Sequence, residues 1–221
     1  MATAVEIIRG SPYFSSLSSS EINGIAGLFF EKKIEKGEVL VWEGDPGEVL
    51  YFVSSGAVKC FKVSSEGKEQ IIEIILPGKS FNDVSVFDGG PSPASAEAMS
   101  AVGIYGLSRD NVQRILKEYP KLYPNVIEVL TTRIRHLLGL VEDLSFRNVI
   151  SRIARILIEH ADGAGPTPKL TQQEMAAIAG TAREVVGRSL KTLQEEGMIR
   201  MERNRLVISD KEALKKMAKA V

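Results

Sequence analysis

Cysteine and histidine are scarce in this sequence, and long apolar runs are missing. Its 221 residues include one cysteine, Cys60, and two histidines. One cysteine cannot form a disulfide within the chain, and it cannot supply the four thiolates that an iron–sulfur cluster usually needs. We expect Cys60 to be an inert core residue, with a redox thiol as the alternative. No run of about eighteen apolar residues occurs, and the first residues lack the basic and apolar segments of a signal peptide, which predicts a cytoplasmic protein without a membrane partner.

Neither positive nor negative charge is in excess over the whole chain, but the two kinds of charge are unevenly distributed along it. The chain contains 28 Lys and Arg and 28 Asp and Glu, for a formal net charge of zero. Residues 146–221 hold 14 of the basic and 9 of the acidic residues, a net charge of +5, so the remainder carries −5. A basic module joined to an acidic one suits a DNA-binding domain attached to a sensor domain. Ordinary variation of surface charge is the alternative explanation.

From about Lys33 to Leu107 the pattern is typical of β-structure. Short apolar runs at residues 39–42, 49–53, 58–63 and 70–76 end at turns that contain glycine. Strands at roughly ten-residue spacing predict an antiparallel barrel or roll. Before it, a short amphipathic helix with a serine N-cap is expected to begin near Ser19, extend through Phe30 and pack against the roll.

After Ser108 the apolar period becomes helical. Beyond Pro124 the apolar residues are spaced by three and four in alternation, at Ile127, Leu130, Ile134, Leu137, Val141 and Leu144. Such a narrow seam is typical of a helix that pairs with an identical helix, so these residues are the predicted dimer interface. A helix packed on its own roll is the alternative. Residues 146–148 interrupt the pattern as a hinge, and Asn148 is the predicted N-cap of a helix over 149–161.

Two short helices follow, predicted over residues 171–179 and about 182–195. Thr171 and Glu174 have the spacing of a capping box, and Gly180 allows the sharp turn of a helix-turn-helix. The apolar faces of the two helices are formed by Met175, Ile178, Val185, Val186, Leu190 and Leu193.

Three outward residues near the start of the second helix are candidates for contacts with DNA bases. Arg183 and Arg188 can donate to guanine, and Glu184 can accept from cytosine. The alternative is a solvent-exposed helix face with a salt bridge between Glu184 and Arg188.

Residues 199–208 alternate around a turn and predict a hairpin, which after a helix-turn-helix is a wing. Arg203 and Arg205 at its tip are expected to contact phosphates, as are Thr171, Gln172 and Thr181.

From about Phe14 to Val207 the chain resembles the family of the cyclic-AMP receptor protein and the fumarate–nitrate reductase regulator. The resemblance is carried by the segments 40–45, 50–56, 67–70, 77–78, 170–175 and 183–188. It implies an α+β protein with a β-roll sensor domain over residues 1–120, a dimerisation helix over 121–145 and a winged helix-turn-helix over 146–221. It also implies a homodimeric transcription regulator that binds inverted repeats with a TGTGA-like or TTGA-like core, with RNA polymerase as a further partner. Arg183, Glu184 and Arg188 match the family's base-contacting residues.

The sequence departs from that family in the effector pocket. Asn82-Asp83-Val84 replaces the family's Gly-Glu-Leu, and Ala94-Ser95-Ala96 replaces Arg-Ser-Ala. Leu137 and Leu138 match the family's adenine-binding hydroxyl pair. A cyclic phosphate without its arginine loses a charge-assisted bidentate bond, so cyclic AMP is not the expected effector. The pocket by resemblance comprises Asn82, Asp83, Val84, Ala94, Ser95, Leu137 and Leu138, and its effector is unknown.

Two alternatives remain, and a third lacks the residues that it would need. The protein could bind DNA without any ligand, because Ala94 replaces the arginine. It could be a haem-based sensor, with His136 as the candidate ligand and His160 as a structural residue. A metal enzyme on the β-roll would need histidines on the strands, and none occurs there.

Overall fold

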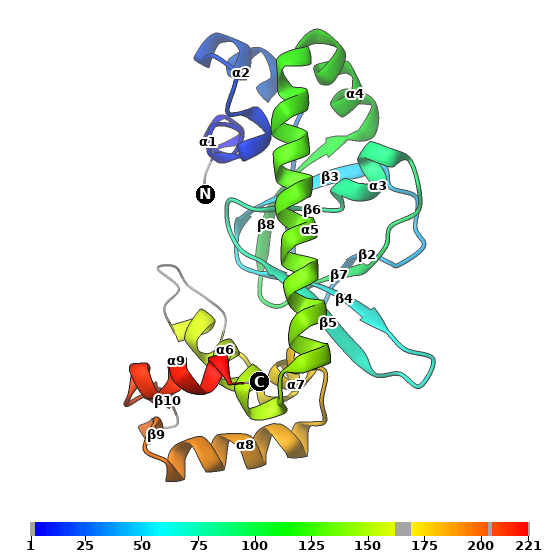
Figure 1. The fold of residues 1–221 in the computed structure, drawn as a ribbon. Helices are drawn as coiled ribbons and strands as arrows, with labels where there is room; N and C mark the ends of the chain where they lie inside the picture. Colours follow the sequence, from blue (N-terminus) through cyan, green and yellow to red (C-terminus); the bar gives the residue numbers. More distant parts are fainter. Residues whose placement is uncertain (1–2, 162–168, 203–204, 221) are drawn as a thin grey trace. The chain divides into compact units, whose positions relative to one another are not determined.

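The structure, a computed structural model, describes residues 3–161, 169–202 and 205–220 (Figure 1). Two compact units are present, one formed by residues 1–62 and 72–136 and the other by residues 63–71 and 137–221. None of the helices in the described part of the chain is both long enough and apolar enough to span a membrane.

The first part of the chain contains short helices and all eight strands of the predicted roll. In order these elements are α1 (Ala4–Gly10), the 3₁₀ helix η1 (Pro12–Phe14), α2 (Ser19–Ala26), β1 (Phe30–Ile34), β2 (Val39–Val41), β3 (Val49–Ser55), β4 (Val58–Val63), β5 (Glu69–Ile75), β6 (Ser80–Phe81), α3 (Asp83–Asp88), β7 (Ser95–Ala98), β8 (Val102–Ser108), α4 (Arg109–Glu118) and the 3₁₀ helix η2 (Pro120–Leu122).

The rest of the chain consists of the long helix α5, further helices and a hairpin. These elements are α5 (Tyr123–Phe146), α6 (Val149–Ala161), α7 (Gln172–Ala179), α8 (Arg183–Glu195), β9 (Ile199–Glu202), β10 (Arg205–Ile208) and α9 (Lys211–Lys219). The predicted fold class is confirmed, with antiparallel sheets followed by a long helix and a helix-turn-helix.

The strands form two four-stranded sheets that share one core. Their orders are β1-β8-β3-β6 and β2-β7-β4-β5. Each of the eight strands contributes at least one buried side chain to this core, namely Ile34, Val41, Val53, Val58, Ile75, Phe81, Ala96 and Ile104. Apolar side chains packed between two sheets are removed from water, which stabilises the sandwich.

The central strands β3 and β8 are buried on both faces. In β3, Val53 contacts the core between the sheets, whereas Leu50 and Phe52 belong to a second core beneath the helices. This double burial explains why residues 49–53 form a continuous apolar run instead of alternating with polar residues.

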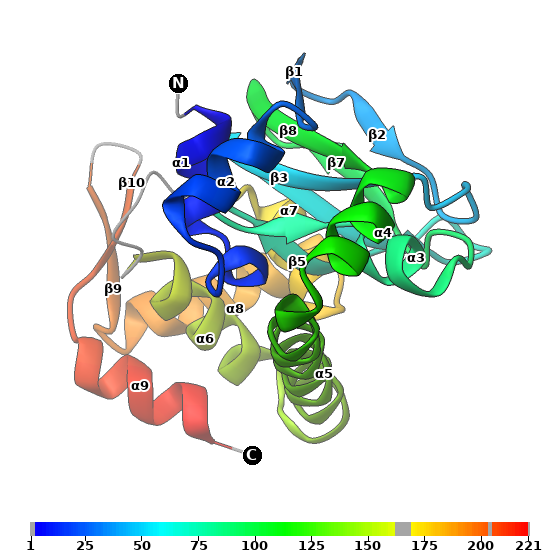
Figure 2. The same ribbon diagram turned by 90° about the horizontal axis from the view of Figure 1, so that it is seen from above.

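The second core of this unit lies where α1, α2, α4 and the start of α5 cover the first sheet. Helices α1 and α2 lie on one side of α5 and α4 on the other, as Figures 1 and 2 show. The core includes a cluster of aromatic rings, with Tyr13 5.6 Å from Phe87 and Phe14 5.9 Å from Phe52 between ring centroids. Leu122 and Val126 join α5 to it.

The prediction for α2 was partly wrong. Ser18 is the N-cap and forms a capping box with Glu21, and Ile22 and Ile25 pack in the core as expected. The helix ends at Ala26, however, and Phe30 is the first residue of β1, paired with Gly106. The reason is packing: the Phe30 ring occupies the space that a Cβ on Gly106 would need, which favours the strand.

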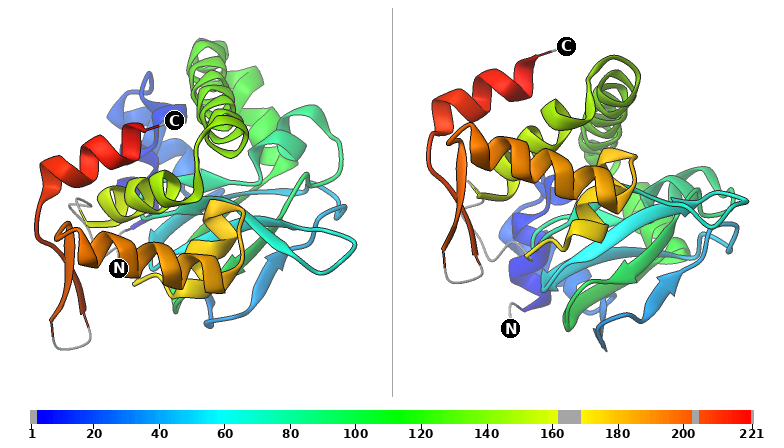
Figure 3. Two further views of the ribbon diagram at one scale, coloured as in Figure 1. Left: turned by 60° about the horizontal axis from the view of Figure 1, so that its bottom comes forward. Right: turned by 90° about the horizontal axis from the view of Figure 1, so that it is seen from below.

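A separate core holds the helices of the second unit together. It contains Ile153, Ala154, Leu157, Val186, Leu193 and Leu214, contributed by α6, α8 and α9, together with Met175, Ala176 and Ala179 of α7. Helix α6 lies between α8 and α9 (Figure 3). Helix α9 was not among the elements predicted from the sequence.

Candidate DNA interface and effector region

The turn between α7 and α8 has the geometry that the sequence predicted. The Thr171 hydroxyl accepts from the Glu174 amide at 3.1 Å and the Glu174 carboxylate accepts from the Thr171 amide at 2.6 Å. Gly180 ends α7 at φ +64, a left-handed conformation that glycine adopts without the steric cost of a Cβ. The Thr181 amide then donates back to the Ala176 carbonyl at 3.0 Å. These bonds fix where α8 begins.

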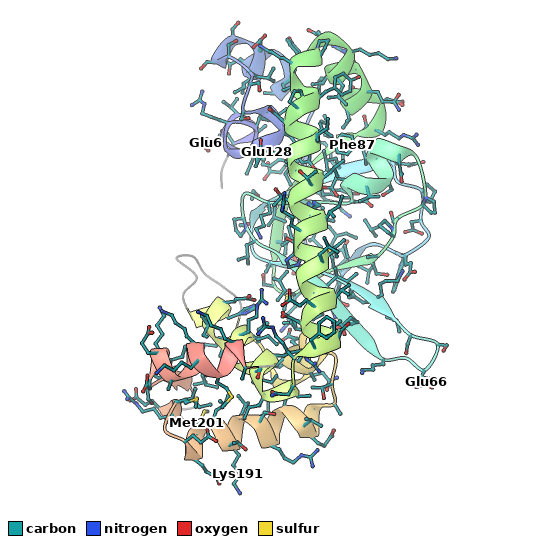
Figure 4. All side chains as sticks on the ribbon, in the orientation of Figure 1. Glu6, Glu66, Phe87, Glu128, Lys191 and Met201 are labelled. Carbon is teal, nitrogen blue, oxygen red and sulfur yellow. The ribbon has the colours of Figure 1, made fainter. Side chains whose placement is uncertain are left out.

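One face of α8 is buried and the opposite face is open. Val186 and Leu193 are fully buried, Leu190 is half-buried, and Ser189 is buried with its hydroxyl donating to the Val185 carbonyl at 2.9 Å. The packing of this face fixes the rotation of the helix about its axis. The charged residues of α8 must therefore project away from the core, as labelled Lys191 does in Figure 4.

The three candidate base-contacting residues lie on that open face. Arg183, Glu184 and Arg188 are all exposed. Within the described residues none of the three forms an ion pair, so the alternative Glu184–Arg188 salt bridge is not present. Their donors and acceptors are thus available to a partner. Ala182 precedes them as an N-cap residue without a side-chain hydrogen bond, which leaves amides of the first turn of α8 open as well.

The candidate phosphate-contacting residues are partly described. Thr171 and Gln172 are exposed at the start of α7, and Thr181 is half-buried in the turn. Strands β9 and β10 form the predicted antiparallel hairpin. Arg203 lies outside the described residues, and for Arg205 only the backbone, in β10, is described.

Asn82 has a structural role in the candidate effector region, where its side chain forms hydrogen bonds to three other residues. It has φ +64, which asparagine tolerates better than most residues. Its side-chain Nδ2 donates to the Val49 carbonyl at 2.9 Å, and its Oδ1 accepts from the hydroxyls of Ser85 and Ser92 at 2.9 and 2.8 Å. With all of these bonds made, Asn82 holds the start of α3 against β3.

Asp83 is a buried acid, with 2% of its surface exposed. The Tyr13 hydroxyl donates to its Oδ2 at 2.6 Å. Arg133 of α5 forms an ion pair with the same oxygen, Nε to Oδ2, at 2.7 Å. Burial and the charge of Asp83 raise the pKa of Tyr13, so its hydroxyl stays protonated and can act as the donor.

Arg133 is a central residue of the candidate effector region that was not predicted from the sequence. Its Nη2 donates to the Ser80 carbonyl at 2.5 Å, and its Nη1 lies 3.5 Å from a carboxylate oxygen of Glu73. The cation is therefore shared between two carboxylates and a carbonyl. Val126 and Val129, seven and four residues earlier on α5, pack against the core, so helical spacing could have predicted that Arg133 points to the roll.

The remaining residues of the predicted pocket differ in their burial. Ser95 is buried and accepts from the Glu43 amide at 3.0 Å, whereas Ala94 is half-buried and Val84 is 43% exposed. Leu137 and Leu138 belong to the second unit and are 44% and 63% exposed.

The predicted dimer seam on α5 is largely exposed. Ile127, Ile134 and Val141 are 61%, 56% and 60% exposed. Leu130 differs, because it is half-buried and packs partly against the core beneath the helices. Leu138, Tyr123 and Phe146 are further exposed apolar residues of α5 that the prediction did not include.

The candidate haem ligand and the single thiol are both engaged. Nε2 of His136 lies 3.2 Å from the Ile72 carbonyl oxygen, an acceptor that requires a proton on that nitrogen, so Nε2 is not free to bind iron in this conformation. His160 Nδ1 contacts the Ile156 carbonyl one turn earlier in α6, which agrees with a structural role. Burial raises the pKa of Cys60 to about 12, so its thiol is inert at neutral pH.

Two parts of the chain match known protein families. Residues 31–119 match the cyclic nucleotide-binding domain family, and residues 151–217 match the Crp-like helix-turn-helix domain. The cyclic AMP receptor protein of Thermus thermophilus is 32% identical over 88% of this chain and 90% of its own length. The chain belongs to the Crp family of transcription regulators.

A further relative agrees with this assignment, and a solved structure shares the fold. The CRP-like cAMP-activated global transcriptional regulator of Mycobacterium tuberculosis is 30% identical and covers 97% of this Crp-family chain and 99% of its own length. The structure of FixK2 from Bradyrhizobium japonicum superposes with a TM-score of 0.77 over 87% of this chain and 98% of its own, at 23% identity, which shows a shared fold. This Crp-family protein is thus a DNA-binding transcription regulator.

Proposed function

We propose that this Crp-family regulator binds inverted-repeat DNA as a homodimer and responds to an effector other than cyclic AMP. The observation that carries the proposal is the open face of α8. Arg183, Glu184 and Arg188 are exposed there and form no ion pair with any residue that the structure describes, on a helix whose other face forms the core of its domain. Arg188 and Arg183 would donate to guanine, and Glu184 would accept from cytosine.

Dimerisation through α5 would account for the exposed apolar side chains of this helix. A row of exposed branched apolar side chains costs free energy in water, and pairing with a second copy of the same helix removes them from it. Two-fold symmetry then requires a DNA site with two half-sites in inverted orientation, about one helical turn apart.

The proposal is tested by selecting bound duplexes from a random pool with the purified full-length protein. We expect the recovered duplexes to contain inverted repeats, each half with a G·C-containing core. Recovery of duplexes without any symmetry would contradict the dimeric part of the proposal, and recovery of the unselected pool would contradict specific DNA binding.

The buried charges of the first unit argue against a cyclic nucleotide. A phosphate placed near Asp83 would meet that carboxylate and Glu73, while the neighbouring cation Arg133 already forms ion pairs with both. Breaking those bonds leaves buried charges without partners, which is costly. We therefore predict no heat of cyclic AMP binding at micromolar concentrations in titration calorimetry, whereas a signal in that range would refute the exclusion of cyclic AMP.

Ligand-independent DNA binding is a second candidate function, and the contacts of Arg133 favour it. Arg133 already joins α5 to β6 and α3 through Ser80 and Asp83, so no small molecule is required for that link. Protein purified through unfolding and refolding, and thereby stripped of small molecules, would keep full affinity for its site if this candidate is correct. An absorption spectrum of freshly purified protein tests the haem alternative, because bound haem gives a Soret band.

A further inference from the structure

A cluster of charged side chains joins the end of α5 to the start of α6. We call Asp143, Arg147, Arg152 and Arg155 the corner cluster; all four belong to the second unit. Asp143 accepts from Arg147 Nε at 2.7 Å and from Arg155 Nη1 at 2.8 Å. Arg155 lies on α6, so this one carboxylate ties the two helices together. The Asp143 side chain is 14% exposed and that of Arg147 is 17% exposed, so the ion pair between them is shielded more than an ordinary surface pair.

The arginines of the cluster also satisfy backbone carbonyls at two helix ends. Arg152 Nη1 donates to the Arg147 carbonyl at 2.6 Å and lies 3.3 Å from the Asp143 carbonyl, at the end of α5. Arg147 Nη1 donates to the Ala218 carbonyl at 2.9 Å, in the last turn of α9. Carbonyls at a helix C-terminus lack partners in the helix and carry partial negative charge, so guanidinium groups are favourable there.

The cluster fixes the direction of α6 relative to the last turns of α5. The Asn148 side chain caps the first turn of α6 by accepting from the Ser151 amide at 2.9 Å, so α6 begins at a defined residue. Ile153 and Leu157 of α6 then pack with α8 in the core of the domain. Because α6 carries that core, the orientation of α8 relative to the end of α5 follows from the corner cluster.

We propose that Asp143 and Arg147 are positioning residues for DNA binding. They hold α8 at the angle to the last turns of α5 at which both copies of α8 in a dimer can contact their half-sites together. This inference rests on the proposed function, because it requires a dimer formed along α5. Helix α9 supports the same arrangement, because the hydrogen bond from Arg147 to the Ala218 carbonyl connects this helix to the corner cluster.

The test compares full-length Asp143→Asn and Arg147→Met with the wild type on two duplexes. One duplex contains the selected inverted repeat and the other contains a single half-site, the latter measured at low salt. We expect each variant to bind the inverted repeat about tenfold more weakly, which is a typical change in affinity when two sites are energetically coupled. We expect each variant to bind the half-site with the affinity of the wild type. Asp143→Glu should restore most of the affinity because it keeps the carboxylate.

Glu142→Gln is the matched control. Glu142 is adjacent to Asp143, its side chain is 60% exposed, and it lies 3.5 Å from Arg147. We expect this variant to bind both duplexes normally. Wild-type affinity of Asp143→Asn for the inverted repeat would overturn the inference, and so would an equal loss on both duplexes, which would indicate damage to the DNA-contacting face itself. A wild type that does not prefer the inverted repeat to the half-site would refute the proposed function, and the inference with it.

Discussion

At the scale of single residues, the exposed cations of α8 are expected to differ in what they recognise. Arg188 lies on the face that begins with Glu184, near the start of the helix, whereas Lys191 lies further along and is 77% exposed, 3.7 Å from Glu195. A bidentate arginine contact with guanine is worth about 1 to 3 kcal/mol of discrimination. We predict that Arg188→Ala lowers affinity for the selected site by about 10- to 100-fold and leaves affinity for random duplex nearly unchanged, as measured by mobility shift.

Lys191→Ala serves as the control for this experiment because it also removes one positive charge from α8. We expect it to weaken binding to selected and random duplexes by the same small factor, since a lysine near phosphates contributes without regard to sequence. If Arg188→Ala behaves like Lys191→Ala, Arg188 does not contact bases.

Single residues also show how far the sequence could predict the candidate sites. The exposure of Arg183 and Arg188 could be predicted, because apolar neighbours at helical spacing fix which face of α8 is buried. The role of Arg133 could not be predicted from the effector motif, since its partners Asp83, Glu73 and Ser80 are 50 or more residues away in the chain. Only the folded roll brings them to α5.

At the scale of elements, α5 offers a direct test of dimerisation. Ile134 lies in the seam and is 56% exposed, and the adjacent Arg135 is exposed one position outside it. We predict that Ile134→Glu shifts the protein from dimer to monomer at micromolar concentration, because pairing would bury two like charges against each other. Arg135→Glu introduces the same residue at the outward position and should leave the dimer intact.

Sedimentation velocity of the two variants gives the masses directly. A dimeric Ile134→Glu protein would place the interface elsewhere. A monomeric wild type would remove the dimer from the proposal altogether.

Elements with strong local signals were predicted well, and those set by long-range packing were not. The capping box of Thr171 and Glu174 and the N-cap at Asn148 are local, and both are confirmed. The end of α2 depends on how the Phe30 ring packs over Gly106, 76 positions along the chain, so local propensity could not give it. Helix α9 had a usable signal, since Asp210 caps it and Leu214 and Met217 follow at helical spacing.

At the scale of the whole molecule, the described residues form separate cores in the two units. Leu107, 1% exposed, lies in the core beneath the helices of the first unit, and Leu193, fully buried, lies in the core of the second. Truncating a buried leucine to alanine removes apolar contacts and leaves a cavity, at a cost of about 2 to 5 kcal/mol.

These separate cores predict independent effects of core substitutions. We predict that Leu193→Ala speeds amide hydrogen exchange throughout α6, α7 and α8 and leaves exchange in β3 and β8 unchanged, while Leu107→Ala does the reverse. Hydrogen exchange followed by mass spectrometry locates the effect by peptide, which a single melting temperature cannot do. Faster exchange in both units after either substitution would contradict this prediction. It would show that the two cores unfold together.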